Sequence, residues 1–304
     1  MGTHTHDRVL VIFPGALGDL ICFAPALQML ARRHRGAALE LMAREELARF
    51  AVDRLDVAQG HSIDRREVAA LFSGSADTAG AEFFSGFVRI HSFFAFANAE
   101  VKITLTRLAR GRVNFHPFRP ADNAHISVSY MRALGDTASS SPHVDLHLKS
   151  GDFQAAHRTL ARSALEPHKF ILLLPGSGSQ VKNWPAANYV SLAQRLASRI
   201  MPVFLLGPAE EAASARFNTC GFVTLAGHEL GEVAALASLS YGFIGNDSGI
   251  SHLASIAGAP GLVLFGPTEP HRWRPLGKVE VLRRDPLQAL EVREVLAAAE
   301  RMFG

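Results

Sequence analysis

Apolar runs along this chain alternate with segments in which apolar residues recur every three or four positions. Val9–Phe13 and Phe170–Leu174 are such runs, and both end in Pro-Gly. A run without polar interruption is typical of a strand that is buried on both faces of a parallel sheet. From Asp19 to Leu30 the apolar spacing becomes helical, so a strand should lead directly into a helix. Pro25 should kink that helix or cost it one hydrogen bond.

The second half of the chain continues this alternation of strand and helix patterns. Strands are expected at Phe170–Leu174, Val203–Leu206, Phe222–Leu225, Tyr241–Gly245 and Gly261–Phe265. Helices are expected at Ala187–Arg199, Ala209–Phe217, Glu229–Leu239, Ser248–Ile256 and Leu287–Met302. In the first half Leu39–Met42 is a further strand, and between Asp53 and Lys149 the pattern assigns no element. Strands that alternate with helices of this length predict parallel sheets with helices on both faces.

The chain length and a sequence pattern that occurs twice predict two lobes. The chain has 304 residues, of which 48% are hydrophobic, and this suits two domains better than one. The runs VLVIFPG and FILLLPG each open a series of alternating strands and helices. The expected fold class is therefore α/β, with two Rossmann-like lobes that are each built on a parallel sheet. We place the boundary between residues 158 and 159, after the polar, turn-rich segment SSSPHVDLHLKSGD.

Composition narrows the functional classes only slightly. The net charge is +3, which permits an anionic partner without specifying one, and no nucleic-acid-binding module is present. Cys22 and Cys220 lie outside any metal-finger or Cys-x-x-Cys spacing, which predicts reduced thiols that are buried or half-buried. Pro14, Gly15 and Asp19 interrupt the first apolar stretch, so we expect neither a signal peptide nor a membrane span, and a cytoplasmic location.

Chemistry is expected at the carboxyl ends of the parallel strands, where doubly wound sheets bind their ligands. Asp19 follows the first strand and stands at the start of a helix. A carboxylate at this place either caps the helix or acts as an acid or base. The residues around Asp19 do not decide between the two roles.

The segment GNDSGISHLASIAG carries the clearest binding pattern. Asp247 or Ser248 can cap the helix that follows, and Gly249 lets a ligand approach the backbone. The free N–H groups of the first turn would suit a diphosphate. The alternative is a well-capped helix with His252 as an ordinary polar residue, but the flanking glycines at a strand end favour phosphate binding.

A second loop, PGSGSQVKNWP, adds Gly176, the hydroxyls of Ser177 and Ser179, and Lys182. A Gly/Ser loop with one lysine can wrap a phosphate and neutralise it, although a solvated surface loop fits equally well. The P-loop spacing is absent, and Val181 stands where a G-x-G-x-x-G motif needs its third glycine. A nicotinamide cofactor is therefore disfavoured.

Two further candidates follow strand ends. Glu210 can hold a ribose hydroxyl, but taken alone it is better interpreted as a first-turn glutamate that the helix dipole favours. His228 follows the strand Phe222–Leu225 and joins the binding candidates. The 14 histidines form no H-E-x-x-H motif and the chain has no Asp-x-Asp pair, so we expect no metal.

The first half also holds an aromatic and a basic segment. Glu82–Glu100 contains six phenylalanines, and TRLARGRVNFHPFRP after it contains four arginines. Core packing and a solvated basic face are the favoured interpretations. The alternatives are an apolar surface that faces a lipid-linked substrate or a membrane, and an acceptor that carries carboxylates or phosphates. The four arginines are Arg107, Arg110, Arg112 and Arg119.

Four segments in this order resemble glycosyltransferase family 9, the heptosyltransferases of lipopolysaccharide core synthesis. They are LGDLICFAPAL, PGSGSQVKNWP, LLGPAEE and GNDSGISHLASIAGAP with LFGPTEP, and they lie within Val9–Pro275. The resemblance implies a GT-B fold, in which two Rossmann-like lobes, residues 1–158 and 159–286, have a cleft between them. It also implies that the C-terminal helix, residues 287–304, packs back on the N-terminal lobe.

The resemblance further implies an inverting, metal-independent transfer of a heptose or related sugar from a nucleotide donor, ADP-linked in the family, to a lipid-linked saccharide. Asp19 matches the proposed general base, with Gly15 and Gly18 on the acceptor side. The residues implied in donor binding are Gly176, Ser177, Ser179, Lys182, Glu210, His228, Asp247, Ser248, Gly249 and His252. The implied partners are the nucleotide sugar, the acceptor and the inner membrane surface, with no cofactor. A sugar-nucleotide epimerase or hydrolase and a non-catalytic binding partner remain alternatives.

Overall fold

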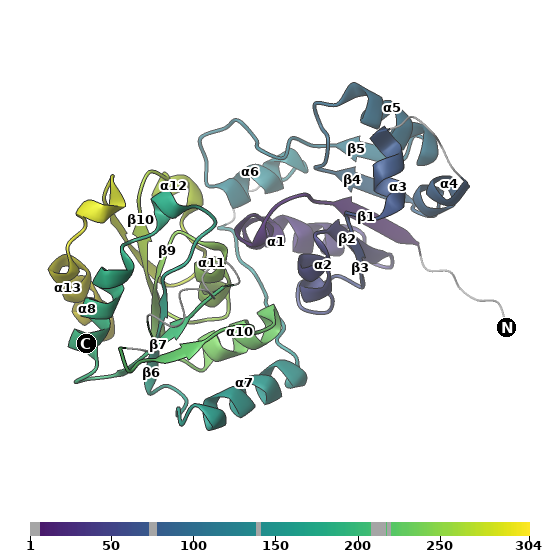
Figure 1. The fold of residues 1–304 in the computed structure, drawn as a ribbon. Coiled ribbons are helices and arrows are strands. Elements are labelled where there is room, and N and C mark those ends of the chain that lie inside the picture. The colour runs from purple at the N-terminus through teal and green to yellow at the C-terminus, as the bar shows by residue number, and fades with distance from the viewer. Residues whose placement is uncertain (1–6, 73–77, 138–140, 208–216, 218–219) are drawn as a thin grey trace. The chain divides into compact units, whose positions relative to one another are not determined.

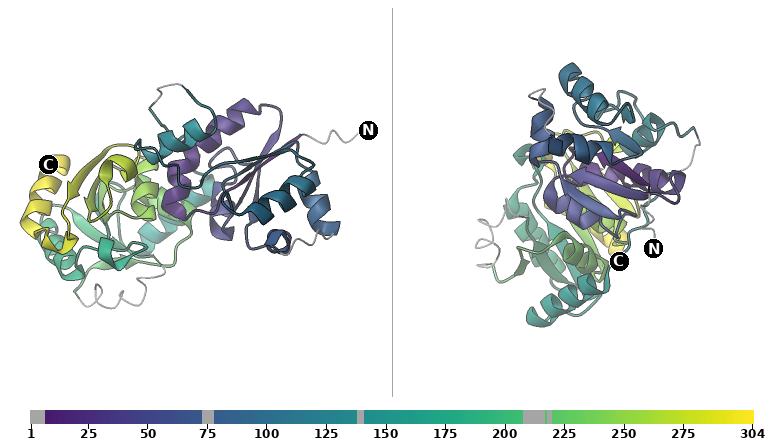
Figure 2. Two further views of the ribbon diagram at one scale, coloured as in Figure 1. Left: turned by 90° about the horizontal axis from the view of Figure 1, so that it is seen from above. Right: turned by 90° about the vertical axis from the view of Figure 1, so that its right-hand side faces the viewer.

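The computed structural model describes residues 7–72, 78–137, 141–207, 217 and 220–304. The chain divides into two compact units, Met1–His147 and Leu148–Gly304 (Figure 1). Each unit has its own parallel sheet, with the alternation of strands and helices that the sequence pattern predicts for most of the second half (Figure 2). No helix among the described residues is long and apolar enough to cross a membrane.

The first unit is built on a five-stranded parallel sheet in the order β3-β2-β1-β4-β5. Its strands are β1 (Arg8–Ile12), β2 (Ala38–Ala43), β3 (Gln59–Ser62), β4 (Arg89–Ser92) and β5 (Val113–Phe115). Its helices are α1 (Leu17–Arg33), α2 (Glu45–Ala51), α3 (Arg66–Ala69), α4 (Thr78–Ser85), α5 (Ala99–Leu108) and α6 (Ile126–Ala133), with a 3₁₀ turn η1 (Ala70–Phe72). The strand order reverses between β1 and β4, and such a switch point is where open α/β sheets bind ligands.

The second unit has a six-stranded parallel sheet in the order β11-β10-β9-β6-β7-β8, with its own switch point between β6 and β9. Its strands are β6 (Phe170–Leu174), β7 (Met201–Leu205), β8 (Val223–Leu225), β9 (Gly242–Asn246), β10 (Gly261–Phe265) and β11 (Val279–Arg283). Its helices are α7 (Ser150–Arg162), α8 (Ala186–Leu196), α10 (Leu230–Ser238), α11 (Gly249–Ile256), α12 (Pro270–Trp273) and α13 (Val292–Phe303). Two 3₁₀ turns, η2 (Gln180–Lys182) and η4 (Leu287–Ala289), complete it.

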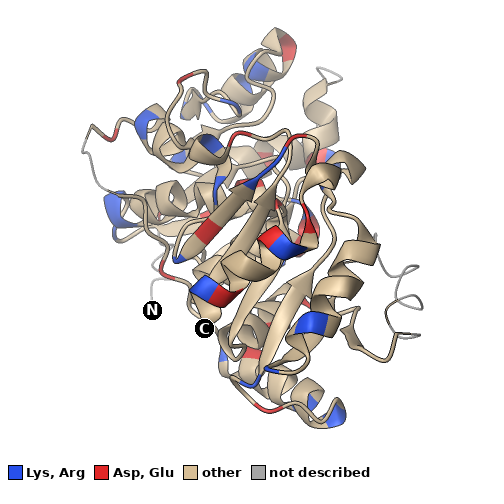
Figure 3. Ribbon diagram, turned by 90° about the vertical axis from the view of Figure 1, so that its left-hand side faces the viewer, with Lys and Arg blue, Asp and Glu red and all other residues tan. Residues whose placement is uncertain are grey.

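Burial explains why these strands have no polar alternation. Every residue of β6, β9 and β10 is buried, as expected for parallel strands covered on both faces. None of the three strands contains a charged residue, and Figure 3 shows Lys, Arg, Asp and Glu mainly on helices and loops. In α1 the helix continues through the buried Pro25, which has no N–H to donate to the preceding turn.

The observed boundary corrects the one expected from sequence. It lies between His147 and Leu148, and a boundary at residue 158 would cut α7. Helix α7 packs on α10, and the Thr159 hydroxyl donates a hydrogen bond to Glu232 of α10 at 2.6 Å. The observed boundary therefore falls within the polar, turn-rich segment rather than after it, and α7, which begins at Ser150, belongs wholly to the second unit.

Residues 287–304, which the resemblance assigns to the first lobe, contribute to the core of the second unit. Val295, Ala298 and Ala299 of α13 are buried in the core of the second unit, against Leu192 and Leu196 of α8. The Trp184 indole also donates to the carbonyl of Leu290 at 2.8 Å. Helix α13 is amphipathic, and its apolar face packs within its own unit.

The expected strands, helices and buried residues are confirmed at some positions of the chain and not at others. The strands and helices expected from Phe170 to Phe265 are present, with ends shifted by a few residues, except that Ala209–Phe217 falls largely outside the described residues. Strands β3 to β5 and β11 were not expected. Cys22 is buried as expected, whereas Cys220 is exposed. Three of the six phenylalanines of Glu82–Glu100 are buried in the core, namely Phe84, Phe87 and Phe93. Phe83 and Phe94 are partly buried and pack against that core.

A row of imidazoles lies within the first unit. His91 of β4 is buried, its Nδ1 lies 3.2 Å from Nε2 of His116, and its ring lies 5.7 Å from the ring of His34. Nδ1 of His116 donates to the carbonyl of Ala133, so the neutral His116 accepts from Nδ1–H of His91. Among the described residues, Nε2 of His91 and Nε2 of His34 have no hydrogen-bond partner. All three rings are therefore arranged to be neutral.

This row should make the first unit sensitive to acid. Burial, followed by repulsion from His116, His34, Arg89 and Arg33, lowers the pKa of His91 to about 3. An unfolded chain takes up a proton near pH 6.5 and the folded chain does not, so stability falls as pH drops below 6.5 toward about 3. The loss approaches about 1.4 kcal/mol per pH unit for one histidine. We expect His91→Phe, which keeps an aromatic ring but cannot titrate, to flatten this dependence.

The measurement is hydrogen exchange of the β4 peptide at pH values from 7.5 to 5, corrected for intrinsic exchange rates. Both tryptophans, Trp184 and Trp273, lie in the second unit, so tryptophan fluorescence would not report on β4. His143→Asn is the matched control, because its side chain is 80% exposed. An equally steep pH dependence in His91→Phe would contradict the assignment.

Candidate active site

Asp19 occupies the first turn of α1, directly beyond the carboxyl end of β1. Its Oδ2 accepts a hydrogen bond from the backbone N–H of Ala16 at 3.1 Å, so the side chain caps the helix from its third position. The side chain is 14% exposed. The capping role is thus observed, and it engages one oxygen of the carboxylate.

The other oxygen of Asp19 is bound by Arg119. Nη1 of Arg119 donates to Oδ1 at 2.6 Å, and the guanidinium lies 4.5 Å from the ring centre of Phe118. A carboxylate offers about four lone-pair positions, so these two contacts leave it able to accept a further hydrogen bond. The arginine side chain is 48% exposed, which keeps this end of the site open to water.

The backbone before α1 is shaped by a glycine. A Cβ on Gly15 would lie 2.5 Å from Cε1 of Phe13 and 2.6 Å from Cβ of Asp19, so no other residue fits without movement. Phe13 stacks on Phe23 and packs edge-to-face with Tyr130. The start of α1, which carries Asp19, therefore lies on a cluster of packed aromatic rings. Burial, followed by the charge of Asp19, raises the pKa of Tyr130. Gly18 lies half-buried in the first turn of α1.

In the second unit, an ion pair joins the two loops that flank the switch point. Nζ of Lys182, in the loop after β6, donates to Oδ2 of Asp247 after β9 at 2.8 Å. Asp247 is 6% exposed while Lys182 is 32% exposed, so the carboxylate is buried beneath a partly accessible ammonium. Nε2 of His252 lies 4.0 Å from Oδ1 of Asp247. Lys182 from the segment PGSGSQVKNWP therefore forms one cluster with Asp247 and His252 from the segment GNDSGISHLASIAG.

Helix α11 starts in this cluster. Ser248 is its N-cap and accepts from the N–H of Ser251 at 3.3 Å, and Gly249 is the first helical residue. The serine thus has the capping role that the sequence left open between Asp247 and Ser248. The positive end of the helix dipole and Lys182 lie at the same strand ends, which is the charge arrangement that an anionic group requires.

Asn246 organises this cluster and was not recognised from the sequence. The residue is fully buried at the end of β9. Its Nδ2 donates to the carbonyl of Pro175 at 2.7 Å, and its Oδ1 accepts from the N–H of Trp184 and from the Tyr189 hydroxyl, both at 3.1 Å. One amide therefore ties the loop that carries Lys182 to the end of β9, which Asp247 follows. Its only sequence signal is its place between Gly245 and Asp247 at a strand end.

Asn246→Ala should destabilise the second unit by about 2 kcal/mol, because it leaves buried donors and an acceptor without partners. Tyr189→Phe, which removes one of these contacts, should cost about 1 kcal/mol. Urea unfolding followed by tryptophan fluorescence measures both, since Trp184 is buried next to the amide. Equal stability of Asn246→Ala and the wild type would show that the amide does not hold the loops.

The remaining candidates have different surroundings. Ser177 donates to the carbonyl of Ser179 at 2.8 Å, so the loop that contains Gly176 is closed on itself in this structure. His228 pairs with Glu232 of α10 at 3.0 Å and lies after the edge strand β8, two strands away from β6. Glu210 lies outside the described residues. Within the described residues, no group of three or more His, Cys, Asp or Glu is arranged to hold a metal ion.

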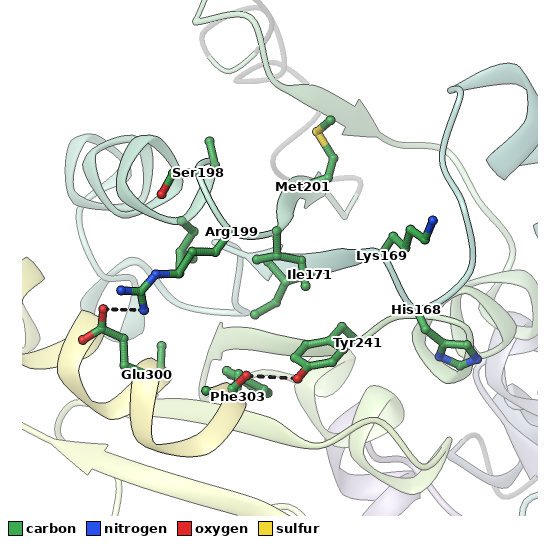
Figure 4. Close-up of a pocket in the computed structure, with 14 residues that line it drawn as sticks. His168, Lys169, Ile171, Ser198, Arg199, Met201, Tyr241, Glu300 and Phe303 are labelled. Carbon is green, nitrogen blue, oxygen red and sulfur yellow. Dashed lines mark hydrogen bonds and ion pairs between the residues drawn. The ribbon is translucent and has the colours of Figure 1, made fainter.

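A cavity of about 550 Å³ lies at the opposite edge of the second sheet (Figure 4). Its lining includes His168 and Lys169 before β6, Arg199 before β7 and Tyr241 before β9. Arg199 is paired with Glu300 at 2.8 Å. Because ligands of doubly wound sheets bind at the carboxyl ends, this cavity is not the counterpart of the Lys182 cluster.

Comparisons with known proteins identify the family of this chain. The family model for glycosyltransferase family 9 (heptosyltransferase) matches residues 120–298. The chain is 27% identical over 174 residues to lipopolysaccharide heptosyltransferase 2 of Escherichia coli (strain K12), an alignment that covers 52% of this chain and 49% of that protein. The chain therefore spans about half or less of the length of the curated relatives it matches.

The fold is shared with solved structures over nearly the whole chain. A glycosyl transferase family 9 protein from Veillonella parvula DSM 2008 superposes with a TM-score of 0.82 at 19% identity, covering 98% of this chain and 97% of that one. The E. coli ADP-heptose lps heptosyltransferase II gives 0.76 at 19% identity, covering 97% and 98%. The α/β fold expected from the resemblance is confirmed. With more than half of its length matched by the family model, this chain belongs to glycosyltransferase family 9.

Proposed function

We propose that this chain is an inverting glycosyltransferase that moves a heptose or related sugar from an ADP-linked donor to a lipid-linked saccharide of the lipopolysaccharide-core type. The observation that carries the proposal is the partly exposed Lys182, which the buried Asp247 holds at the start of α11. Family membership supports a sugar donor, and a solved relative is described as a heptosyltransferase with ADP.

On the donor side, the diphosphate lies against Lys182 and the first-turn N–H groups of α11. The leaving nucleoside diphosphate gains negative charge as the sugar departs, and an ammonium and oriented amides stabilise that charge in place of a divalent cation. His252 and Ser248 border this position. The other residues assigned to the donor are Gly176, Ser177, Ser179, Glu210, His228, Asp247 and Gly249.

On the acceptor side, Asp19 acts as the general base, with Gly15 and Gly18 beside it. The carboxylate takes the proton of an acceptor hydroxyl while the hydroxyl oxygen bonds to the anomeric carbon of the donor sugar. The bond between that carbon and the diphosphate oxygen breaks, and its electrons leave with the nucleoside diphosphate. A single displacement of this kind inverts the anomeric configuration. Arg119 fixes the direction of the carboxylate.

The proposal is tested by incubating the full chain with ADP-heptose and a core saccharide acceptor and detecting the product by mass spectrometry. The same reaction in EDTA tests whether a divalent metal is needed, and a thermal-shift panel of nucleoside diphosphates tests the preference for ADP. Transfer that resists EDTA is the expected result. Donor conversion to an epimer or free sugar without acceptor would overturn the proposal in favour of an epimerase or hydrolase.

A further inference from the structure

The first unit exposes large apolar side chains that its core does not use. Phe72 of η1 is 50% exposed, Phe96 after β4 is 43% exposed and Ile103 of α5 is 69% exposed. Exposed apolar side chains that gather in one place mark interaction surfaces, whereas isolated ones are ordinary. The question is therefore whether these three gather.

Ring contacts connect the segments that carry them. The ring of Phe72 lies 5.8 Å from the ring of Phe94, two residues before Phe96. Nζ of Lys102 lies 5.2 Å from the ring centre of Phe96, and the next residue is Ile103. The end of η1, the loop after β4 and the start of α5 thus form one surface. We call Phe72, Phe94, Phe96 and Ile103, with Lys102, the aromatic surface.

Helix α5, which contributes Lys102 and Ile103 to the aromatic surface, is basic. Arg107 lies one helical turn beyond Ile103, and Arg110 follows the end of α5; both side chains are exposed. Glu100 is the acid on the same segment, so Lys102, Arg107 and Arg110 leave it with an excess of positive charge. Apolar side chains flanked by lysine and arginine are the composition of peripheral membrane-binding surfaces.

Charge selects among the possible occupants. In a symmetric dimer the same surface faces itself, so Lys102, Arg107 and Arg110 of two copies would approach one another and repel. An anionic lipid surface attracts the same three residues and accepts the phenylalanines at its boundary between head groups and acyl chains.

We propose that the aromatic surface docks this chain on an anionic phospholipid bilayer. This inference rests on the proposed function and deepens it. Phe94 and Phe96 follow β4, whose neighbour in the sheet is β1, and Asp19 follows β1. All parallel strands end at the same edge of a sheet, so Phe94, Phe96 and the proposed base lie at one edge. A bilayer bound there presents a lipid-linked acceptor to that edge.

The test is co-sedimentation of the full chain with vesicles of phosphatidylglycerol and phosphatidylcholine, compared with phosphatidylcholine alone. The wild type should bind the anionic vesicles and release them as salt is raised. Phe96→Ser with Ile103→Ser, and separately Arg107→Gln with Arg110→Gln, should each lower vesicle partitioning by about 10-fold. Met201→Ser is the matched control, because Met201 is 49% exposed in the second unit, and it should partition like the wild type.

Three results would overturn the proposal. They are equal partitioning of the variants and the wild type, equal binding to uncharged vesicles, and a concentration-dependent dimer that Phe96→Ser with Ile103→Ser abolishes. Transfer to a water-soluble acceptor fragment should be unchanged in every variant. If the wild type transfers no sugar to this fragment, the proposed function is refuted but the vesicle result still stands. A failure of the proposed function can therefore be distinguished from a failure of the membrane proposal.

Discussion

Asp19→Asn is expected to lower the rate of sugar transfer by about 100-fold or more while leaving ADP affinity unchanged. The amide has the shape of the carboxylate but cannot take a proton from the acceptor hydroxyl. The affinity should persist because the proposed donor contacts belong to the loops after β6 and β9, which are part of the other unit. Single-turnover transfer and calorimetric titration with ADP measure the two quantities separately.

The controls separate charge from structure. Asp19 caps α1 through Ala16 and is bound by Arg119, so the variant could disturb the first turn; circular dichroism and the melting temperature check this. Asp64→Asn changes an exposed carboxylate of the same unit and should transfer normally. Arg119→Ala keeps the carboxylate but removes its clamp, and we expect a smaller loss of rate. Normal turnover in a folded Asp19→Asn variant would exclude Asp19 as the base.

How much of the fold the sequence could predict depended on the length of each strand's apolar run. The strands FILLL and GLVLF are uninterrupted, and both were located to the residue. In contrast, β3 is QGHS and β4 is RIHS, and neither carries a run that a pattern could detect. These short strands are stabilised by pairing in register with β2 and β1, which is information from distant residues. The first lobe could therefore be expected as a whole but not strand by strand.

The candidate site was predictable where it followed strand ends. Asp19, Lys182 and Asp247 all come shortly after a strand, and the carboxyl ends of β1, β6 and β9 do flank the two switch points. Arg119 could be noticed as one of four arginines but not paired with Asp19, because it lies 100 residues away in sequence. The Asn246 amide is neither charged nor part of a recognised motif, so the sequence does not single it out. Its structural role comes from three hydrogen-bond partners that come together only in the folded chain.

Lys182→Ala is expected to weaken ADP binding by about 100-fold, the loss that corresponds to one strong charge-assisted contact. The ammonium is the partly exposed cation at the start of α11, and no other residue of the cluster with Asp247 and His252 offers a permanent positive charge. Titration calorimetry with ADP measures the affinity. Lys169→Ala removes an exposed lysine of the same unit that pairs with Glu166, and it should bind ADP like the wild type.

A second variant is needed because Lys182 is paired with Asp247. Lys182→Ala removes the cation that neutralises the Asp247 carboxylate, whose side chain is only 6% exposed. An uncompensated buried charge both destabilises the fold and repels a phosphate. In Lys182→Ala with Asp247→Asn that charge is gone. If Lys182 contacts the diphosphate directly, the double variant remains weak in ADP binding although its melting temperature recovers. If affinity recovers with stability, the lysine serves only to neutralise Asp247, and the α11 amides alone must hold the donor.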